Sequence, residues 1–279
     1  MTIELTMALL PSSISAVGFV YGLLAAFFIL FPLYSAWEMR RYRQREAQLS
    51  AADKAAERLT DYRKTIAILW TTTALVGMLL AQGALSAEQL FLVPRFGLLG
   101  TALALIGCAL LLFQARGYAS PELEAGQTPD REQEQARQQL RAKTRDQLGH
   151  IEPLMPRSRR ELGWFYGLSL SAGFCEEVLF RGFLVAVLTP ALGFWGAALV
   201  STLAFGYGHI YQGGLYGFVR TATVGAVMML IVYLSGSIWP AVLLHAVIDL
   251  TGGFIGFHCL KDETPDAGSG LDDEALAPA

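Results

Sequence analysis

Three long stretches of this sequence contain no charged side chain. They cover residues 5–37, 65–87 and 96–115, and each is predominantly apolar. A helix needs about 20 apolar residues to cross the hydrocarbon core of a bilayer, and a buried helix of a soluble protein rarely needs runs of that length. Charged residues make up only 16% of the chain, against about 25% in soluble domains. The sequence therefore predicts an all-α polytopic membrane bundle embedded in the lipid bilayer.

The apolar segments predict about seven transmembrane helices. Turn-forming residues separate the last four of them, at Thr189 and Pro190, at Gly213 and Gly214, and between Ser235 and Pro240. The expected spans cover residues 14–37, 66–85, 96–115, 162–188, 191–211, 218–234 and 238–257.

Lys and Arg are concentrated in two segments, residues 38–64 and 116–160, which together hold 17 of the 21 in the chain. Basic segments stay on the cytoplasmic side of a membrane. We therefore expect a multi-pass protein of the cell membrane with its N-terminus outside and its C-terminus in the cytoplasm. The first apolar run is too long for a cleaved signal and is interpreted as a retained anchor. The net charge of −3 does not indicate a nucleic-acid partner.

This pattern divides the chain into four expected parts. Residues 1–115 hold three accessory spans, and residues 116–160 form a polar cytoplasmic segment whose helix-forming part has almost no apolar face. Residues 161–259 form a four-span core. Residues 260–279 form an acidic tail that we expect to be disordered.

Ionisable side chains enter the apolar spans only in the four-span core, where each costs about 2.5–3.5 kcal/mol to insert. The first group is Glu176, Glu177 and Arg181. Glu177 and Arg181 are four residues apart on one helix face and are expected to pair, whereas Glu176 lies about 100° round the helix. The charge of Glu177 is then neutralised by Arg181, while Glu176 remains available for chemistry. The alternative is a packing ion pair with Glu176 bonded to a neighbouring helix.

Two further pairs show the same four-residue spacing. Phe205 and His209 share a helix face, although a lone histidine near a membrane boundary is often only an interfacial residue. His245 and Asp249 lie one turn apart, so the aspartate is expected to orient the imidazole. Alternatively, this pair only joins two helices.

A carboxylate and two imidazoles on three separate spans are more informative together than singly. Glu176 and His209 can remove a proton from water, and His245 can donate to a developing oxyanion, which are the functions that peptide hydrolysis requires. The depths conflict, however. At 1.5 Å per residue, Glu176 lies about 20 Å below the cytoplasmic surface and His209 about 5 Å. The fourth span must begin later, the fifth must continue beyond Tyr211, or the helix must break at Gly206 or Gly208.

The three motifs EExxxR, FxxxH and HxxxD, in this order, resemble the CAAX-protease and bacteriocin-processing membrane peptidases, also called the Abi family, which are related to the type II CAAX prenyl endopeptidases. The segment from Ser235 to His245 also resembles the residues that lead into the third motif in this family. The resemblance covers residues 161–259.

The resemblance implies a glutamate-dependent intramembrane endopeptidase that cleaves a membrane protein or peptide. Glu176 and His209 would activate water, His245 and Asp249 would line the oxyanion site, and three residues would support them: Glu177, Arg181 and Phe205. The prenyl endopeptidases typically carry Asn where this chain has Asp249. Because an ionised carboxylate repels an oxyanion, we expect Asp249 to be protonated or turned to orient His245.

A zinc site is an alternative interpretation of these residues. Glu and His side chains are plausible zinc ligands, but the spacing is not HExxH and the resemblance favours a site without metal or other cofactor. Cys108, Cys175 and Cys259 show no CxxC spacing and are interpreted as small packing residues.

Two non-enzymatic functions remain open at this point. The first is a non-catalytic membrane protein of the same family, linked to bacteriocin immunity or to scaffolding. In such a protein the polar groups would serve helix packing. The second is a proton-coupled carrier, which the lack of an inverted repeat in the sequence disfavours.

Overall fold

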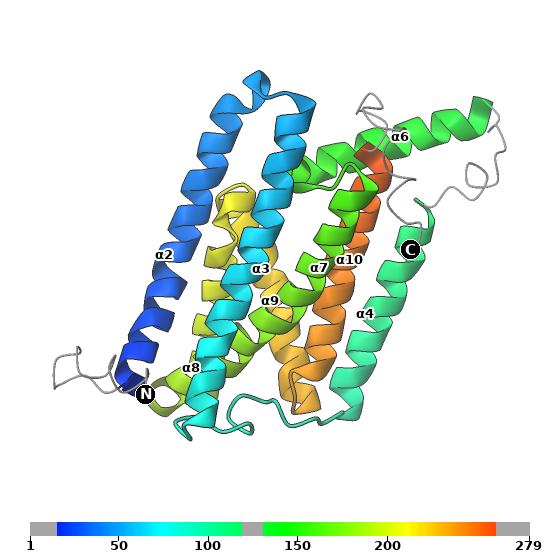
Figure 1. Cartoon of the computed structure of the whole chain (residues 1–279). Coiled ribbons are helices and arrows are strands. Elements are labelled where there is room, and N and C mark those ends of the chain that lie inside the picture. Colours follow the sequence, from blue (N-terminus) through cyan, green and yellow to red (C-terminus); the bar gives the residue numbers. More distant parts are fainter. Residues whose placement is uncertain (1–15, 119–130, 261–279) are drawn as a thin grey trace, which may run out of the picture.

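The computed structural model describes residues 16–118 and 131–260, and within these ranges every regular element is helical (Figure 1). The predicted all-α bundle is confirmed. The expectations for the N-terminal 15 residues and for the acidic tail lie outside the described residues. The elements in chain order are α2 (Ala16–Arg45), η1 (Glu46–Gln48), α3 (Ala51–Ala81), α4 (Leu98–Arg116), α6 (Arg131–Leu148), η2 (Gly149–Leu154), α7 (Arg159–Glu176), η3 (Glu177–Leu184), α8 (Val185–Gly208), η4 (Ile210–Gln212), α9 (Leu215–Ser235) and α10 (Trp239–Leu260).

Six helical stretches in the described part are long and apolar enough to cross a membrane, and the longest covers 50 residues, Arg159–Gly208. This stretch turns back on itself at Gly193, whose φ of 66° and ψ of 167° are not helical. The segments before and after Gly193 pack together, since Ser201 Oγ donates a hydrogen bond to the Phe180 carbonyl at 2.6 Å. Figure 1 shows the chain descending along α7 and returning along α8. Counted as two spans, this stretch and the other five agree with the expected number of about seven.

The position of that reversal differs from the prediction. Pro190, expected to end the fourth span, lies inside α8, and the chain turns three residues later. A φ near +66° is accessible to glycine without steric cost, so the reversal falls at Gly193. The two later breaks are where the sequence places them: Gly213 and Gly236 have φ of 117° and 74°.

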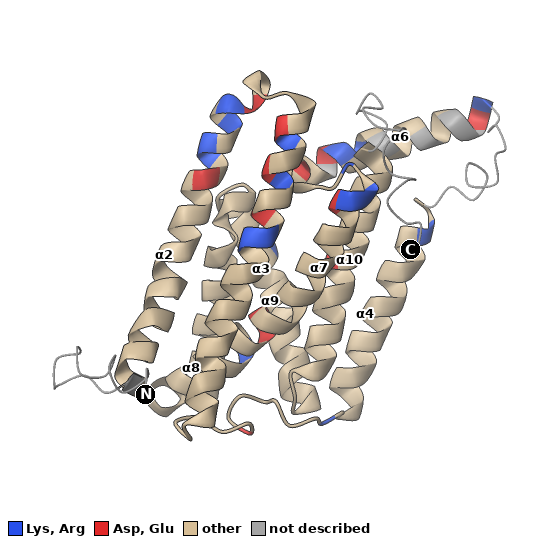
Figure 2. Cartoon of the chain, in the orientation of Figure 1, with Lys and Arg blue, Asp and Glu red and all other residues tan. Residues whose placement is uncertain are grey.

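The helices α2 and α3 continue beyond their apolar runs and carry the first basic segment. Ser50 and Asp53 form a capping box that starts α3. Residues 38–64, expected as a loop, are therefore mostly helical extensions. Figure 2 shows Lys, Arg, Asp and Glu gathered at this end of the bundle, together with the ends of α6 and α7.

The end of the polar segment forms a cap, defined here as residues 144–155. The exposed helix α6 fits the expected solvated helix, but Leu148, Ile151, Leu154 and Met155 pack against apolar residues of α7 and α10. His150 lies between two elements: Arg43 of α2 donates hydrogen bonds to its Nδ1 and carbonyl at 3.0 and 2.8 Å, and its ring contacts Gly213. The cap thus belongs to the folded bundle.

Small residues allow the core helices to approach closely. A Cβ on Gly173 of α7 would lie 2.9 Å from the Ala246 nitrogen of α10, and one on Gly206 of α8 would lie 2.8 Å from the Phe218 carbonyl oxygen of α9. Such contacts are typical of helix pairs in membranes. They bring the three polar motifs to one level of the bundle.

Candidate active site

A cavity of about 600 Å³ runs from the cap into the core of the bundle. Its lining comes from α2, α3, the cap and η4, and from α7, α8, α9 and α10. The part beside the cap is called the cap end here, and the part beside Glu176 and His245 is called the inner end. All four residues predicted to be catalytic line it: Glu176, His209, His245 and Asp249. The three spans expected to be accessory, which lie outside the family resemblance, therefore supply part of the cavity wall.

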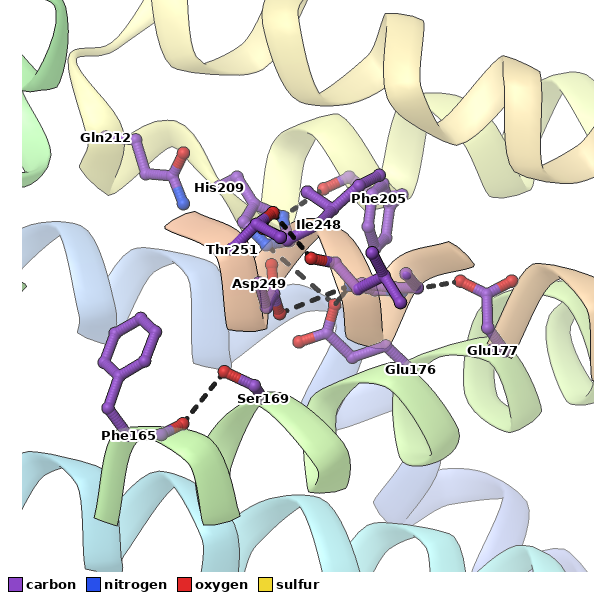
Figure 3. Close-up of polar contacts among 12 residues, drawn as sticks. Phe165, Ser169, Glu176, Glu177, Phe205, His209, Gln212, Ile248, Asp249 and Thr251 are labelled. Atoms are coloured by element: carbon purple, nitrogen blue, oxygen red, sulfur yellow. Dashed lines mark hydrogen bonds and ion pairs between the residues drawn. The ribbon is translucent and has the colours of Figure 1, made fainter. Parts of the chain in front are cut away.

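Glu176, His209 and His245 converge at the inner end, as the sequence predicts. Glu176 Oε2 lies 3.9 Å from Nε2 of each histidine. Glu176 is the last residue of α7, His209 directly follows α8, and His245 lies on α10. Figure 3 shows Glu176 and His209 in the same group of side chains as Asp249. Oε2 of Glu176 accepts no hydrogen bond from the described residues.

The depth conflict disappears because the connection between α8 and α9 does not reach the level of the connection between α2 and α3 (Figure 1). The helix α8 ends at Gly208 and η4 follows, so of the three alternatives the structure agrees best with a break at Gly208. His209 therefore lies at the level of Glu176.

The predicted pair of Glu177 and Arg181 is confirmed and is fully buried. Arg181 donates to Glu177 Oε1 at 2.9 Å and to the Gly225 carbonyl of α9 at 3.2 Å. Both residues lie on η3, a π-helical turn that continues α7. π-Helical turns are often found at functional sites. This one brings two oppositely charged side chains into the middle of the bundle.

The partner that orients His245 differs from the prediction. His245 Nδ1 donates to Glu177 Oε1 at 2.8 Å, whereas Asp249 Oδ2 lies 3.7 Å from Nε2, beyond hydrogen-bond distance. The expectation that Asp249 orients the ring is therefore wrong. Glu177 holds this position because η3 turns its side chain toward α10.

Phe205 contacts residues of all three polar motifs. Its ring lies 4.1 Å from the Arg181 guanidinium carbon and meets the His245 ring edge-on at 5.8 Å between centroids. Its carbonyl accepts the Nδ1–H of His209 at 2.8 Å. A carbonyl only accepts hydrogen bonds, so this contact fixes the proton of His209 on Nδ1 and leaves Nε2 as an acceptor.

Both imidazoles thus use Nδ1 for a structural hydrogen bond and present Nε2 to Glu176. The result is one carboxylate oxygen and two ring nitrogens around the inner end of the cavity. These groups can accept a proton from water and return it to a leaving group. The same residue types could ligate a metal, but among the described residues no group of three has the arrangement of a metal site.

Sequence reasoning missed two features of the site. The contact between Glu177 and His245 joins residues 68 positions apart, and spacing along one helix does not reveal it. The cap residues that line the cavity lie in a segment of high charge. The apolar cluster Leu148, Ile151 and Leu154 at its end is the signal that could have indicated burial.

Comparison with known proteins adds one match. No curated protein and no solved structure matches the chain. The model of the family "type II CAAX prenyl endopeptidase Rce1-like" matches residues 158–251, which contain all three motifs. The matched segment begins just before α7 and ends within α10. Residues 158–251 are therefore similar to the family that the three motifs predict.

Proposed function

We propose that this protein is an intramembrane endopeptidase that hydrolyses a peptide bond with water activated by Glu176 and His209. The observation that carries the proposal is the position of Glu176 Oε2, 3.9 Å from both ring nitrogens at the inner end of a cavity. A buried carboxylate oxygen without a protein donor is suited to accept a hydrogen bond from a substrate or water.

In this mechanism the water donates one proton to Glu176 while His209 Nε2 accepts its second hydrogen bond. The water oxygen attacks the carbonyl carbon of the scissile bond, and the carbonyl oxygen becomes an oxyanion. When the oxyanion collapses to a carbonyl, the C–N bond breaks and Glu176 gives its proton to the leaving nitrogen. General acid–base catalysis of this kind contributes about 10²–10⁴-fold to the rate.

His245 stabilises the oxyanion. Its Nδ1–H is held by the Glu177 carboxylate, which supports a positive charge on the ring and directs Nε2–H toward the cavity. Asp249 lies 3.7 Å from that nitrogen and shapes the same wall. An uncharged Asp249 fits this role, because a carboxylate would repel the oxyanion.

The cap end of the cavity faces the cytoplasm in this proposal, with the N-terminus outside and the C-terminus inside. The charged ends of α2, α3, α6 and α7 support this orientation, because basic segments stay on the cytoplasmic side (Figure 2). Green fluorescent protein fused to the C-terminus should fluoresce, and alkaline phosphatase fused there should be inactive. The reverse result would contradict the orientation.

The test of the function compares membrane peptides between cells that produce the wild type and cells that produce Glu176→Gln. Peptides that the wild type alone generates should be absent with Glu176→Gln, and the purified variant should lose cleavage by about 10³-fold while it keeps its melting temperature. Glu88→Gln is the matched control, since Glu88 is exposed and does not line the cavity. Full cleavage by Glu176→Gln would contradict the proposed role of Glu176, and absence of cleavage by the wild type would support the non-catalytic scaffold or immunity protein instead.

A further inference from the structure

Three Lys or Arg side chains line the cavity: Arg58, Lys64 and Arg220. The first two are neutralised by carboxylates. Arg58 Nε lies 2.8 Å from Glu161 Oε2, and Lys64 contacts both Glu38 and Asp61. These cations therefore hold helices together and have little capacity left for a ligand.

Arg220 on α9 differs from the other two. Its side chain is exposed, and its NH2 group donates to Gln212 Oε1, a neutral amide oxygen, at 2.6 Å. Among the side chains that the structure describes, no carboxylate forms an ion pair with Arg220. A guanidinium has five N–H donors, so most of them remain for another partner.

The surroundings of Arg220 place it on the His209 side of the reactive groups. Gln212 ends η4, three residues after His209, and its amide donates to the Tyr211 hydroxyl at 3.1 Å. The ring of Tyr211 lies 5.9 Å from the ring of His209. Figure 3 shows Gln212 next to His209. Arg220 is thus connected to the reactive end through a short polar chain.

We propose that Arg220, positioned by Gln212, binds a carboxylate of the peptide substrate. This inference rests on the proposed function, because the anionic groups of an unmodified peptide are its C-terminal carboxylate and its Asp and Glu side chains. The planar guanidinium matches the two oxygens of a carboxylate. The remaining wall of the inner end carries Glu176, whose ionised carboxylate repels an anion.

The consequence is a fixed direction for the bound peptide. Its carboxylate lies at Arg220 and the adjoining backbone extends toward Glu176 and His209. Arg220 then determines which peptides bind and takes no part in proton transfer.

The experiment measures binding of three fluorescein-labelled peptides with the same apolar sequence. One ends in a free carboxylate, one is amidated, and one is amidated but carries an internal Glu. Fluorescence anisotropy is recorded with purified Glu176→Gln protein in detergent. At least one anionic peptide should bind about 10-fold more tightly than the neutral one, as expected for a hydrogen-bonded charge. The two anionic peptides distinguish a terminal carboxylate from a side chain.

Variants in the same background link this preference to Arg220. Arg220→Gln should bind all three peptides equally, and Arg220→Lys should keep part of the preference. Arg41→Gln is the matched control, because Arg41 is exposed on α2, packs on Trp37 and does not line the cavity. Its preference should equal that of the parent protein.

Two outcomes overturn the proposal: equal binding of neutral and anionic peptides by the parent protein, or a preference that survives in Arg220→Gln. Binding is measured in a variant without the proposed chemistry, so this test is separate from the proposed function. If wild-type protein cleaves no peptide while the carboxylate preference depends on Arg220, the endopeptidase proposal fails and the anion site stands.

Discussion

Two buried ion pairs in this protein have the same composition but different surroundings. Arg58 of α3 and Glu161 of α7 form the outer pair, with side chains 4% and 3% exposed. Arg181 and Glu177 form the inner pair, with side chains that are fully buried. Glu161 accepts two hydrogen bonds from Arg58 and one from the Arg157 backbone. All its contacts join structural elements.

Glu177 shares its Oε1 between Arg181 and His245, while its Oε2 and Arg181 Nε have no hydrogen-bond partner among the described residues. The inner pair is thus less completely satisfied and connects to a ring that lines the cavity. A buried charge without full pairing costs free energy. The comparison indicates that the outer pair stabilises the contact of α3 with α7, whereas the inner pair also positions a reactive group.

For the comparison of the two pairs, the largest expected effect follows from Glu177→Gln. Gln still accepts the Nδ1–H of His245 but cannot support a positive charge on the ring, so kcat should fall by about 10²-fold. The variant also leaves Arg181 unpaired, which should lower its stability. Peptide cleavage and thermal unfolding are measured on the same preparation.

The double variant Glu177→Gln with Arg181→Met separates these two effects. Removing both charges should restore much of the melting temperature while cleavage stays low. Recovery of wild-type kcat in the double variant would show that the inner pair serves folding alone.

The outer pair should show the opposite pattern. Glu161→Gln leaves Arg58 buried without a counter-charge, which should cost about 3–5 kcal/mol of stability. The kcat of the molecules that remain folded should equal that of the wild type. Chemical unfolding and active-fraction titration provide the two measurements. A large loss of kcat in fully folded Glu161→Gln would remove the distinction between the pairs.

Asp249→Asn should have a smaller effect. Glu177, not Asp249, fixes the His245 ring, so loss of this carboxyl charge should change kcat by no more than about threefold. An Asn here also donates to an oxyanion, which offsets any loss. Steady-state cleavage checks the value, and a decrease of about 10²-fold would show that Asp249 takes part in proton transfer.

Strong chelation should have the smallest effect. Because carboxylate and imidazole groups suffice for the proposed proton transfers, incubation with EDTA followed by desalting should leave kcat unchanged, and the purified protein should contain no stoichiometric zinc. Loss of activity that zinc restores would instead assign Glu176, His209 and His245 as metal ligands.

The sequence by itself determined the helical membrane fold and the identity of the polar residues. A long apolar run in lipid satisfies its backbone hydrogen bonds within one segment by forming an α-helix. The four-residue spacing of Glu177 and Arg181 places them on one face of a helix, and the observed ion pair follows from that local geometry.

Only the tertiary structure decided which residue orients His245 and what encloses the cavity. The contact of Glu177 with His245 depends on the reversal at Gly193, on the π-helical turn and on the close packing of Gly173 against Ala246. Spacing along one helix carries no information about the distance between helices, which is set by side-chain packing. For the same reason, the sequence did not indicate that the cap, α2 and α3 line the cavity.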